Sequence, residues 1–311
     1  MQKTVFAALG ALMLLSYRAS ADAPLYVGFL EGPQTAAIGA NPPISARTHV
    51  RIAFRKDGLV WKPMASNFDT PSALSLASRA YPGSVRWTVV FDGRTLGDLT
   101  SRTPGKLHWY SDIGTHVLKT EAAVPMVRAG AADFFYGGGN KAKIRPLLLI
   151  SAGTSTPAQW DPQGWKPSAL NPDERRMAIA AFRNKVVSSQ RCDAPEQSPG
   201  HPVPYGDNAV AIVKSYRDNG GEVLFSARLN DPKANCDFFD DETFFSYWFV
   251  IDRQRHIHYL DSQMTPIDAA DLDHSGRSSW LFFTSHGDND DGYELFYDDF
   301  KKKALFQWSY H

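Results

Sequence analysis

Short apolar runs alternate with turn-forming residues along most of this chain. Turns of this kind lie at Asp57-Gly58, Asp92-Gly93, Asn219-Gly220-Gly221, Arg253-Gln254-Arg255 and 286–292. Asp-Gly and Asn-Gly pairs supply the positive φ angles that tight hairpins need. The flanking runs are rich in Val, Ile, Phe, Tyr and Trp, which favour a pleated, half-buried surface. The pattern therefore predicts a mainly β protein made of antiparallel hairpins.

The hairpin turns recur at intervals of about 35 residues, close to the repeat of stacked four-stranded units. This spacing favours a β-propeller-like arrangement. A large β-sandwich or two β domains would fit the same pattern, because no repeat is visible at the level of single residues.

One segment has helical periodicity instead. Asn171 can cap a helix, Pro172 suits its first position, and Glu174 stands where a capping box places an acid. Apolar residues then recur at helical spacing as far as Val186. We expect a helix near 172–187, packed on the β body. A Pro- and Gly-rich stretch before it suggests a join between an N-terminal β region, 22–170, and a C-terminal β region, 171–311.

The first 21 residues read as a secretory signal peptide. Lys3 precedes an apolar core at 5–15, which is too short to span a bilayer, and Ala19-Ser20-Ala21 offers a cleavage site. We expect export to the periplasm or the medium after cleavage near Ala21. No later stretch approaches membrane-spanning length, so the mature chain is expected to be soluble.

Composition adds two constraints. The 33 basic and 33 acidic residues cancel, which argues against nucleic acid as a partner. Cys192 and Cys236 are the two cysteines, and in an oxidising compartment they would most simply form a disulfide.

The strongest local motif with chemistry in it spans 271–279. Asp271, Asp273 and Ser275 alternate around a turn that Gly276 permits, and the Arg277 carbonyl could add a further oxygen. Alternating oxygen ligands around a sharp turn suit a hard cation such as Ca²⁺. Phe282 stands where an EF-hand needs its closing Glu, and a strand follows the loop, so an EF-hand is excluded. The alternative is a hydrogen-bonded Asp/Ser turn without metal.

This loop and the strand after it, at 280–284, resemble the FG-GAP/VCBS type of repeat, in which an Asp-rich loop precedes a strand of a propeller blade. The resemblance implies calcium held by Asp271, Asp273, Ser275 and Ser279, with the carbonyl of Arg277. Ser275 and Ser279 stand where that family prefers acids, so lower calcium affinity is expected. RCDA at 191–194, PVPYGD at 202–207, NCD at 235–237 and the closing segment also resemble a group of uncharacterised exported bacterial proteins ending in such a blade.

Other polar clusters have an ordinary explanation beside a functional one. Acidic residues at 237–242 could form a glycosidase-like pair, a calcium loop or a solvated loop; they are Asp237, Asp240, Asp241 and Glu242. Asp288, Asp290 and Asp291 could bind a cation or form a hairpin turn. His256 and His258 could share a transition metal or form a polar face. Trp160 and Trp165 could stack on sugars or pin a long connection onto the sheet.

The sequence lacks the commonest hydrolase signatures, including a G-x-S-x-G elbow and an H-E-x-x-H helix. We therefore expect a binding or structural role, with a calcium-stabilised C-terminal loop and a protein or glycan as partner. The alternative is a carbohydrate-active or other hydrolase that uses the acidic cluster at 237–242. The ligand and the oligomeric state are not determined by these patterns.

Overall fold

The structure, a computed structural model, describes residues 24–31, 49–66, 79–102, 115–117, 146–151, 159–191, 201–230, 246–285 and 290–309. Within them the fold is mainly β, as predicted, with antiparallel sheets and a single α-helix. Three larger sheets carry the architecture, and each has its own place in the chain.

The first of these is the N-terminal sheet, with strand order β3-β2-β1-β7-β4-β5 and β6 paired to β2. Its strands are β1 (Tyr26–Glu31), β2 (His49–Asp57), β3 (Val60–Pro63), β4 (Ser84–Phe91), β5 (Arg94–Arg102), β6 (Thr115–Val117) and β7 (Leu147–Ser151). Strand β7 is an unbroken apolar run that lies buried between β1 and β4. Such a run is typical of a central strand covered on both faces.

The second is the helix-backed sheet, with strand order β14-β13-β12-β11-β8. Its strands are β8 (Lys166–Pro167), β11 (Val210–Arg217), β12 (Val223–Leu229), β13 (Tyr247–Ile251) and β14 (Ile257–Ser262). Helix α2 (Pro172–Lys185) covers its outer face, where Ala178 and Phe182 pack against Phe225 and Phe249. A small ribbon, β9 (Ser189–Arg191) with β10 (His201–Val203), and a 3-10 turn, η1 (Asp207–Ala209), complete this part.

The third is the C-terminal sheet, a four-stranded meander. It comprises β15 (Met264–Ala270), β16 (Ser279–Ser285), β17 (Asp290–Tyr297) and β18 (Lys302–Ser309). It is apolar on both faces. Leu281 and Leu295 pack into the core shared with the N-terminal sheet, whereas Trp280, Phe282 and Phe296 pack into the core shared with the helix-backed sheet. The continuous apolar run at 280–283 follows from this double burial.

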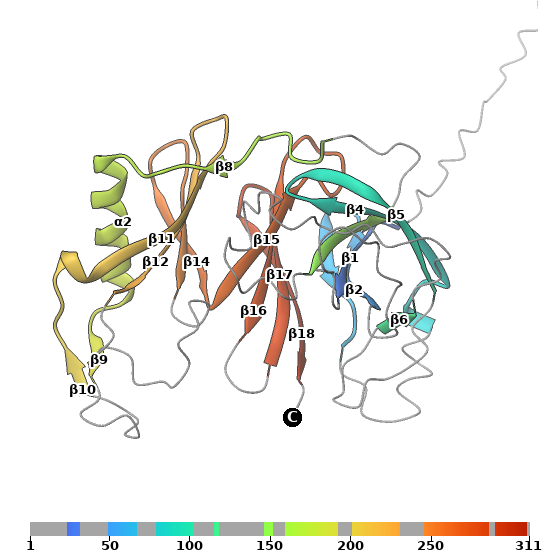
Figure 1. Cartoon of the computed structure of the whole chain (residues 1–311), viewed down its shortest axis with the longest axis horizontal. Helices are drawn as coiled ribbons and strands as arrows, with labels where there is room; N and C mark the ends of the chain where they lie inside the picture. Colours follow the sequence, from blue (N-terminus) through green and yellow to red (C-terminus); the bar gives the residue numbers. More distant parts are fainter. Residues whose placement is uncertain are drawn as a thin grey trace, which may run out of the picture.

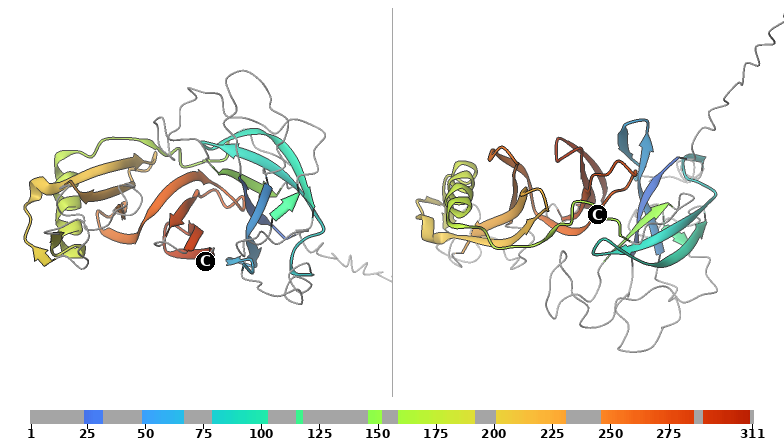
Figure 2. Two further views of the ribbon diagram at one scale, coloured as in Figure 1. Left: turned by 60° about the horizontal axis from the view of Figure 1, so that its bottom comes forward. Right: turned by 90° about the horizontal axis from the view of Figure 1, so that it is seen from above.

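The layers therefore lie in a row: α2, the helix-backed sheet, the C-terminal sheet and the N-terminal sheet (Figures 1 and 2). The sheet that comes last in the sequence is the one in the middle. Each interface between neighbouring layers has its own buried cluster of aliphatic and aromatic side chains.

Several local predictions are confirmed. The predicted turns connect β2 to β3, β4 to β5, β11 to β12 and β13 to β14, all antiparallel. Of the turn predicted at 286–292, residues 286–289 lie outside the described part of the chain and 290–292 belong to β17. The helix begins at Pro172, after an Asn171–Glu174 capping box, and ends at Lys185.

The described sheets form a row rather than a ring of blades, so the propeller arrangement is not seen in this part of the chain. Two features explain the difference. The N-terminal sheet is not a meander, because β7 inserts between β1 and β4. In addition, the N-terminal sheet and the helix-backed sheet follow one another in sequence, yet the C-terminal sheet lies between them. The predicted division of the chain at 170 stays a prediction.

One further property concerns membranes. Among the described residues, no helix has both the length and the apolar character needed to cross a bilayer.

Candidate functional site at the upper rim

Strands and connecting loops of the three larger sheets end together at the top of Figure 1; we call this region the rim. A segment at 159–165, which we call the strap, runs along it. The strap's backbone bonds to all three sheets in turn. Trp160 N donates to Gly93 O (2.7 Å), Trp160 O accepts from Asp271 N (2.7 Å), and Gln163 O accepts from Asn219 N (2.9 Å). The strap therefore joins one hairpin or loop of each sheet.

The two tryptophans of the strap occupy different interfaces. Trp160 is 2% exposed and lies in the core between the N-terminal and C-terminal sheets, and its Nε1 donates to Thr95 Oγ1 (3.0 Å). Trp165 is 3% exposed and lies in the core between the C-terminal and helix-backed sheets, where it meets Trp280 edge-on. Neither ring offers a free face for a sugar. Their predicted alternative role, pinning the connection onto the sheets, is confirmed.

Asp161 fixes the turn of the strap between these tryptophans. Its carboxylate is buried and accepts hydrogen bonds from Gly164 N (3.0 Å), Trp165 N (2.6 Å) and Ser278 Oγ (2.5 Å). Burial raises the pKa of Asp161, although these hydrogen bonds oppose the effect. Gly164 has φ +67°, and a Cβ there would lie 2.4 Å from the Asn219 side chain. The turn therefore requires glycine.

The predicted calcium loop lies against the strap. Asp271 binds its own loop: Oδ1 accepts from Ser275 N (2.9 Å), and Oδ2 accepts from Gly276 N (2.7 Å). Gly276 has φ +78°, in agreement with its predicted role in the turn. Ser275 Oγ also faces Asp271 Oδ1, at 3.3 Å. Both oxygens of the Asp271 carboxylate are thus engaged within the chain.

Asp273 faces the N-terminal sheet. Its Oδ2 lies 2.5 Å from Nζ of Lys56, a residue of β2. Burial alone would raise the pKa of Asp273, but hydrogen bonds from Lys56 and Ser275 outweigh it and lower the pKa. The loop's second carboxylate is therefore paired with an ammonium group that is distant in sequence.

The two remaining predicted ligands are the carbonyl of Arg277 and Ser279, and the role of that carbonyl stays a prediction. The Arg277 side chain forms an ion pair with Asp299, in the β17–β18 turn, and approaches Asp298. Ser279 is buried at the start of β16 and pairs in register with Ala270. The structure thus brings Asp271, Asp273 and Ser275 together. Within the described ranges, no group of three or more His, Cys, Asp or Glu side chains is arranged to hold a metal ion.

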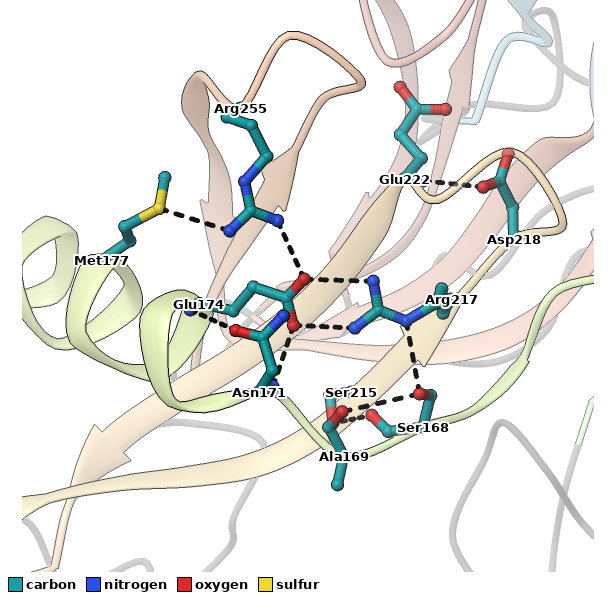
Figure 3. Close-up of polar contacts among 10 residues, drawn as sticks. All are labelled: Ser168, Ala169, Asn171, Glu174, Met177, Ser215, Arg217, Asp218, Glu222 and Arg255. Carbon is teal, nitrogen blue, oxygen red and sulfur yellow. Dashed lines mark hydrogen bonds and ion pairs between the residues drawn. The ribbon is translucent and has the colours of Figure 1, made fainter.

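A buried ion cluster lies at the end of the rim beside α2 (Figure 3). Glu174, 1% exposed, receives the guanidinium of Arg217 through two hydrogen bonds (3.1 and 2.7 Å) and that of Arg255 through one (2.9 Å). It also accepts from Asn171 N, which closes the capping box. Burial would raise the pKa of Glu174, but hydrogen bonds from Arg217, Asn171 and Arg255 lower it to about 2.

The β11–β12 turn carries two more buried acids. Asp218 accepts from Glu222 N (2.7 Å) and pairs with the Arg253 guanidinium (3.2 Å). Figure 3 shows the Glu222 carboxylate directed away from Asp218. Within the described part of the chain it has no hydrogen bond or ion pair, although Glu222 is only 6% exposed. Burial raises the pKa of Glu222, and the nearby charges of Asp218 and Asp299 raise it further.

The two predicted histidines lie in the next hairpin. His256 Nδ1 and His258 Nε2 approach Asp252 Oδ2 at 3.4 and 3.0 Å, and both rings are more than half exposed. Burial would raise the pKa of Asp252, but hydrogen bonds from His258 and His256 lower it. Asp252 is thus the acid beside these two exposed rings, but the three side chains are not among any group in the described residues that is arranged to hold a metal ion.

Some predicted residues lie outside the described part of the chain. These are the signal peptide at 1–21, Cys192, Cys236, Asp237, Asp240, Asp241, Glu242 and Asp288. The disulfide and the acidic pair therefore stay predictions. Asp290 and Asp291 begin β17.

Comparison with known proteins gave no match to a protein-family model, to a curated protein or to a solved structure. The resemblance to FG-GAP/VCBS loops therefore rests on the residues of the loop alone.

Proposed function

We propose that this protein is an exported module with a binding or structural role, and that the rim holds the sheets together instead of catalysing a reaction. The observation that supports this most directly is the pairing of the rim carboxylates. Glu174, Asp218 and Asp273 each contact a cationic side chain, and Asp161 and Asp271 accept backbone amides. Carboxylates engaged in this way have little freedom to bind or protonate a substrate.

Export is supported by the order of charge, apolar core and cleavage site at the N-terminus. A protein or a glycan is the expected partner. The hydrolase alternative depends on the acidic residues at 237–242, outside the described part of the chain. Its proposed sugar platforms, Trp160 and Trp165, are buried, so this part of the hydrolase model loses its support.

A structural role and a catalytic role of the rim predict opposite effects on stability when the charge of a rim acid is removed. For a structural role, Glu174→Gln should lower the free energy of unfolding by about 2–4 kcal/mol, because two arginines lose a buried partner. Asp218→Asn should lower it by about 1–3 kcal/mol, because the substitution removes one of the two acceptor oxygens and the negative charge that faces Arg253. Urea denaturation at pH 7 measures both.

Asp173→Asn is the matched control. Asp173 is the neighbouring acid on α2, is largely exposed and, within the described part of the chain, pairs only with Arg176. We expect a change within about 0.5 kcal/mol. Catalytic carboxylates are often held at a cost in stability, so their removal commonly leaves a protein as stable or more stable. Unchanged or increased stability in both rim variants would therefore contradict the structural role.

A further inference from the structure

The ion pair between Lys56 and Asp273 joins two sheets that are far apart in the sequence. Lys56 lies in β2, next to the β2–β3 turn, and its backbone N donates to Leu25 O (2.9 Å). Its Nζ lies 2.5 Å from Asp273 Oδ2 and 6.0 Å from the centre of the Trp61 ring. The two side chains are 19% and 18% exposed. The pair is therefore more shielded from solvent than ordinary surface ion pairs.

The charges of the loop fit this ammonium better than a divalent ion. Calcium sites are built from several carboxylates and carbonyl oxygens, and fewer negative charges give weaker binding. This loop keeps two carboxylates, because Ser275 and Ser279 carry none. Both oxygens of Asp271 already accept backbone N–H groups. Asp273 is the carboxylate of the loop that faces a cation, and the positive charge of Lys56 balances its negative charge.

We propose that the Lys56 ammonium takes the place that a calcium ion holds in the loops this one resembles. The cation of the loop is then supplied by the chain itself, and it fastens the N-terminal sheet to the C-terminal sheet. A calcium ion coordinated by Asp273 would have to displace Lys56. The loop is accordingly a latch between sheets that needs no metal.

Calcium dependence tests the first half of this inference. The full chain is unfolded thermally with 2 mM CaCl2 or with 2 mM EDTA, in parallel with the Asp273→Asn variant. We expect the wild-type midpoint to be the same in both solutions, because a ligand bound only to the folded state would raise it. A calcium-induced rise that is absent from Asp273→Asn would overturn the inference. A rise that persists in Asp273→Asn would place the ion elsewhere, and the double-mutant cycle below would then decide.

A double-mutant cycle tests the latch itself. Lys56→Met and Asp273→Asn should each lower the midpoint by about 2–5 °C, and the double variant should lower it no further than the larger single effect. The control is the exposed pair Lys62–Asp57 on the same hairpin, 2.6 Å apart. Lys62→Met and Asp57→Asn should each change the midpoint by less than about 1 °C. Additive effects of Lys56→Met and Asp273→Asn would show that the pair carries no coupling and would overturn the inference.

Discussion

Glu174 and Glu222 are both buried at the upper ends of the helix-backed sheet, yet their surroundings shift their pKa values in opposite directions. Glu174 faces two guanidinium groups, whereas the Glu222 carboxylate has acidic neighbours and no hydrogen bond to the described residues. The lowered pKa of Glu174 means that its contribution to stability is present above the unfolded value, 4.5, and is lost as the pH falls towards 2. The raised pKa of Glu222 means that its ionised form lowers stability at neutral pH, and this cost is removed as the pH falls and the carboxylate is protonated.

Glu222→Gln should stabilise the protein at neutral pH. The groups that face Glu222 are Asp218, Asp299 and Asp252, which disfavour its charge, and Arg253, which favours it. The substitution removes a buried negative charge, so we expect the free energy of unfolding at pH 7 to rise by about 0.5–2 kcal/mol. Chemical denaturation of both proteins between pH 4 and pH 8 measures the effect.

The sign of the pH dependence provides the check. Because the folded-state pKa of Glu222 lies above the unfolded value, the wild type gains stability from this residue as the pH falls towards 4.5. The advantage of Glu222→Gln should therefore shrink as the pH falls towards 4.5. An advantage that grows on acidification, or a loss of stability at pH 7, would show that Glu222 has a favourable partner in its ionised form.

At the scale of elements, the strap links the three larger sheets through buried side chains and backbone hydrogen bonds. It places one tryptophan in each interface of the C-terminal sheet and bonds to one turn or loop of each of the three larger sheets. The sequence predicted the hairpins and α2 because their signals are local: turn residues, alternation and a capping box. It did not predict the strap's contacts. Gln163 and Ser278, which meet through a 2.6 Å hydrogen bond, are distant in the chain. Ser278 belongs to the motif at 271–279, but nothing in that motif indicates Gln163 as its partner.

Truncation of either strap tryptophan should loosen a whole interface. Trp160→Ala and Trp165→Ala should each lower the free energy of unfolding by about 3–5 kcal/mol, the usual cost of removing a buried indole. Lys166→Ala, an exposed position next to the strap, is the control and should change it by less than about 0.5 kcal/mol. Guanidinium denaturation measures all three. If either tryptophan variant lost no more stability than Lys166→Ala, the claim that the strap stabilises both interfaces would be contradicted.

At the scale of the whole molecule, the position of the C-terminal sheet decides how the layers cooperate. Its two apolar faces belong to two different cores, so separation of either neighbouring sheet would expose one of these faces to water. The sequence predicts half-buried strands beside its turns, whereas the run at 280–283 is buried on both faces of the C-terminal sheet. It could not show which sheets cover those faces, because that depends on contacts between residues from opposite ends of the chain. The pairing of Lys56 with Asp273 was hidden for the same reason.

Differential scanning calorimetry of the full chain tests most directly whether the three sheets form one unit tied at the rim. The shared cores and the strap predict a single transition, with a calorimetric enthalpy equal to the van't Hoff enthalpy. Two resolved transitions, with the N-terminal sheet unfolding separately from the other two, would contradict the account.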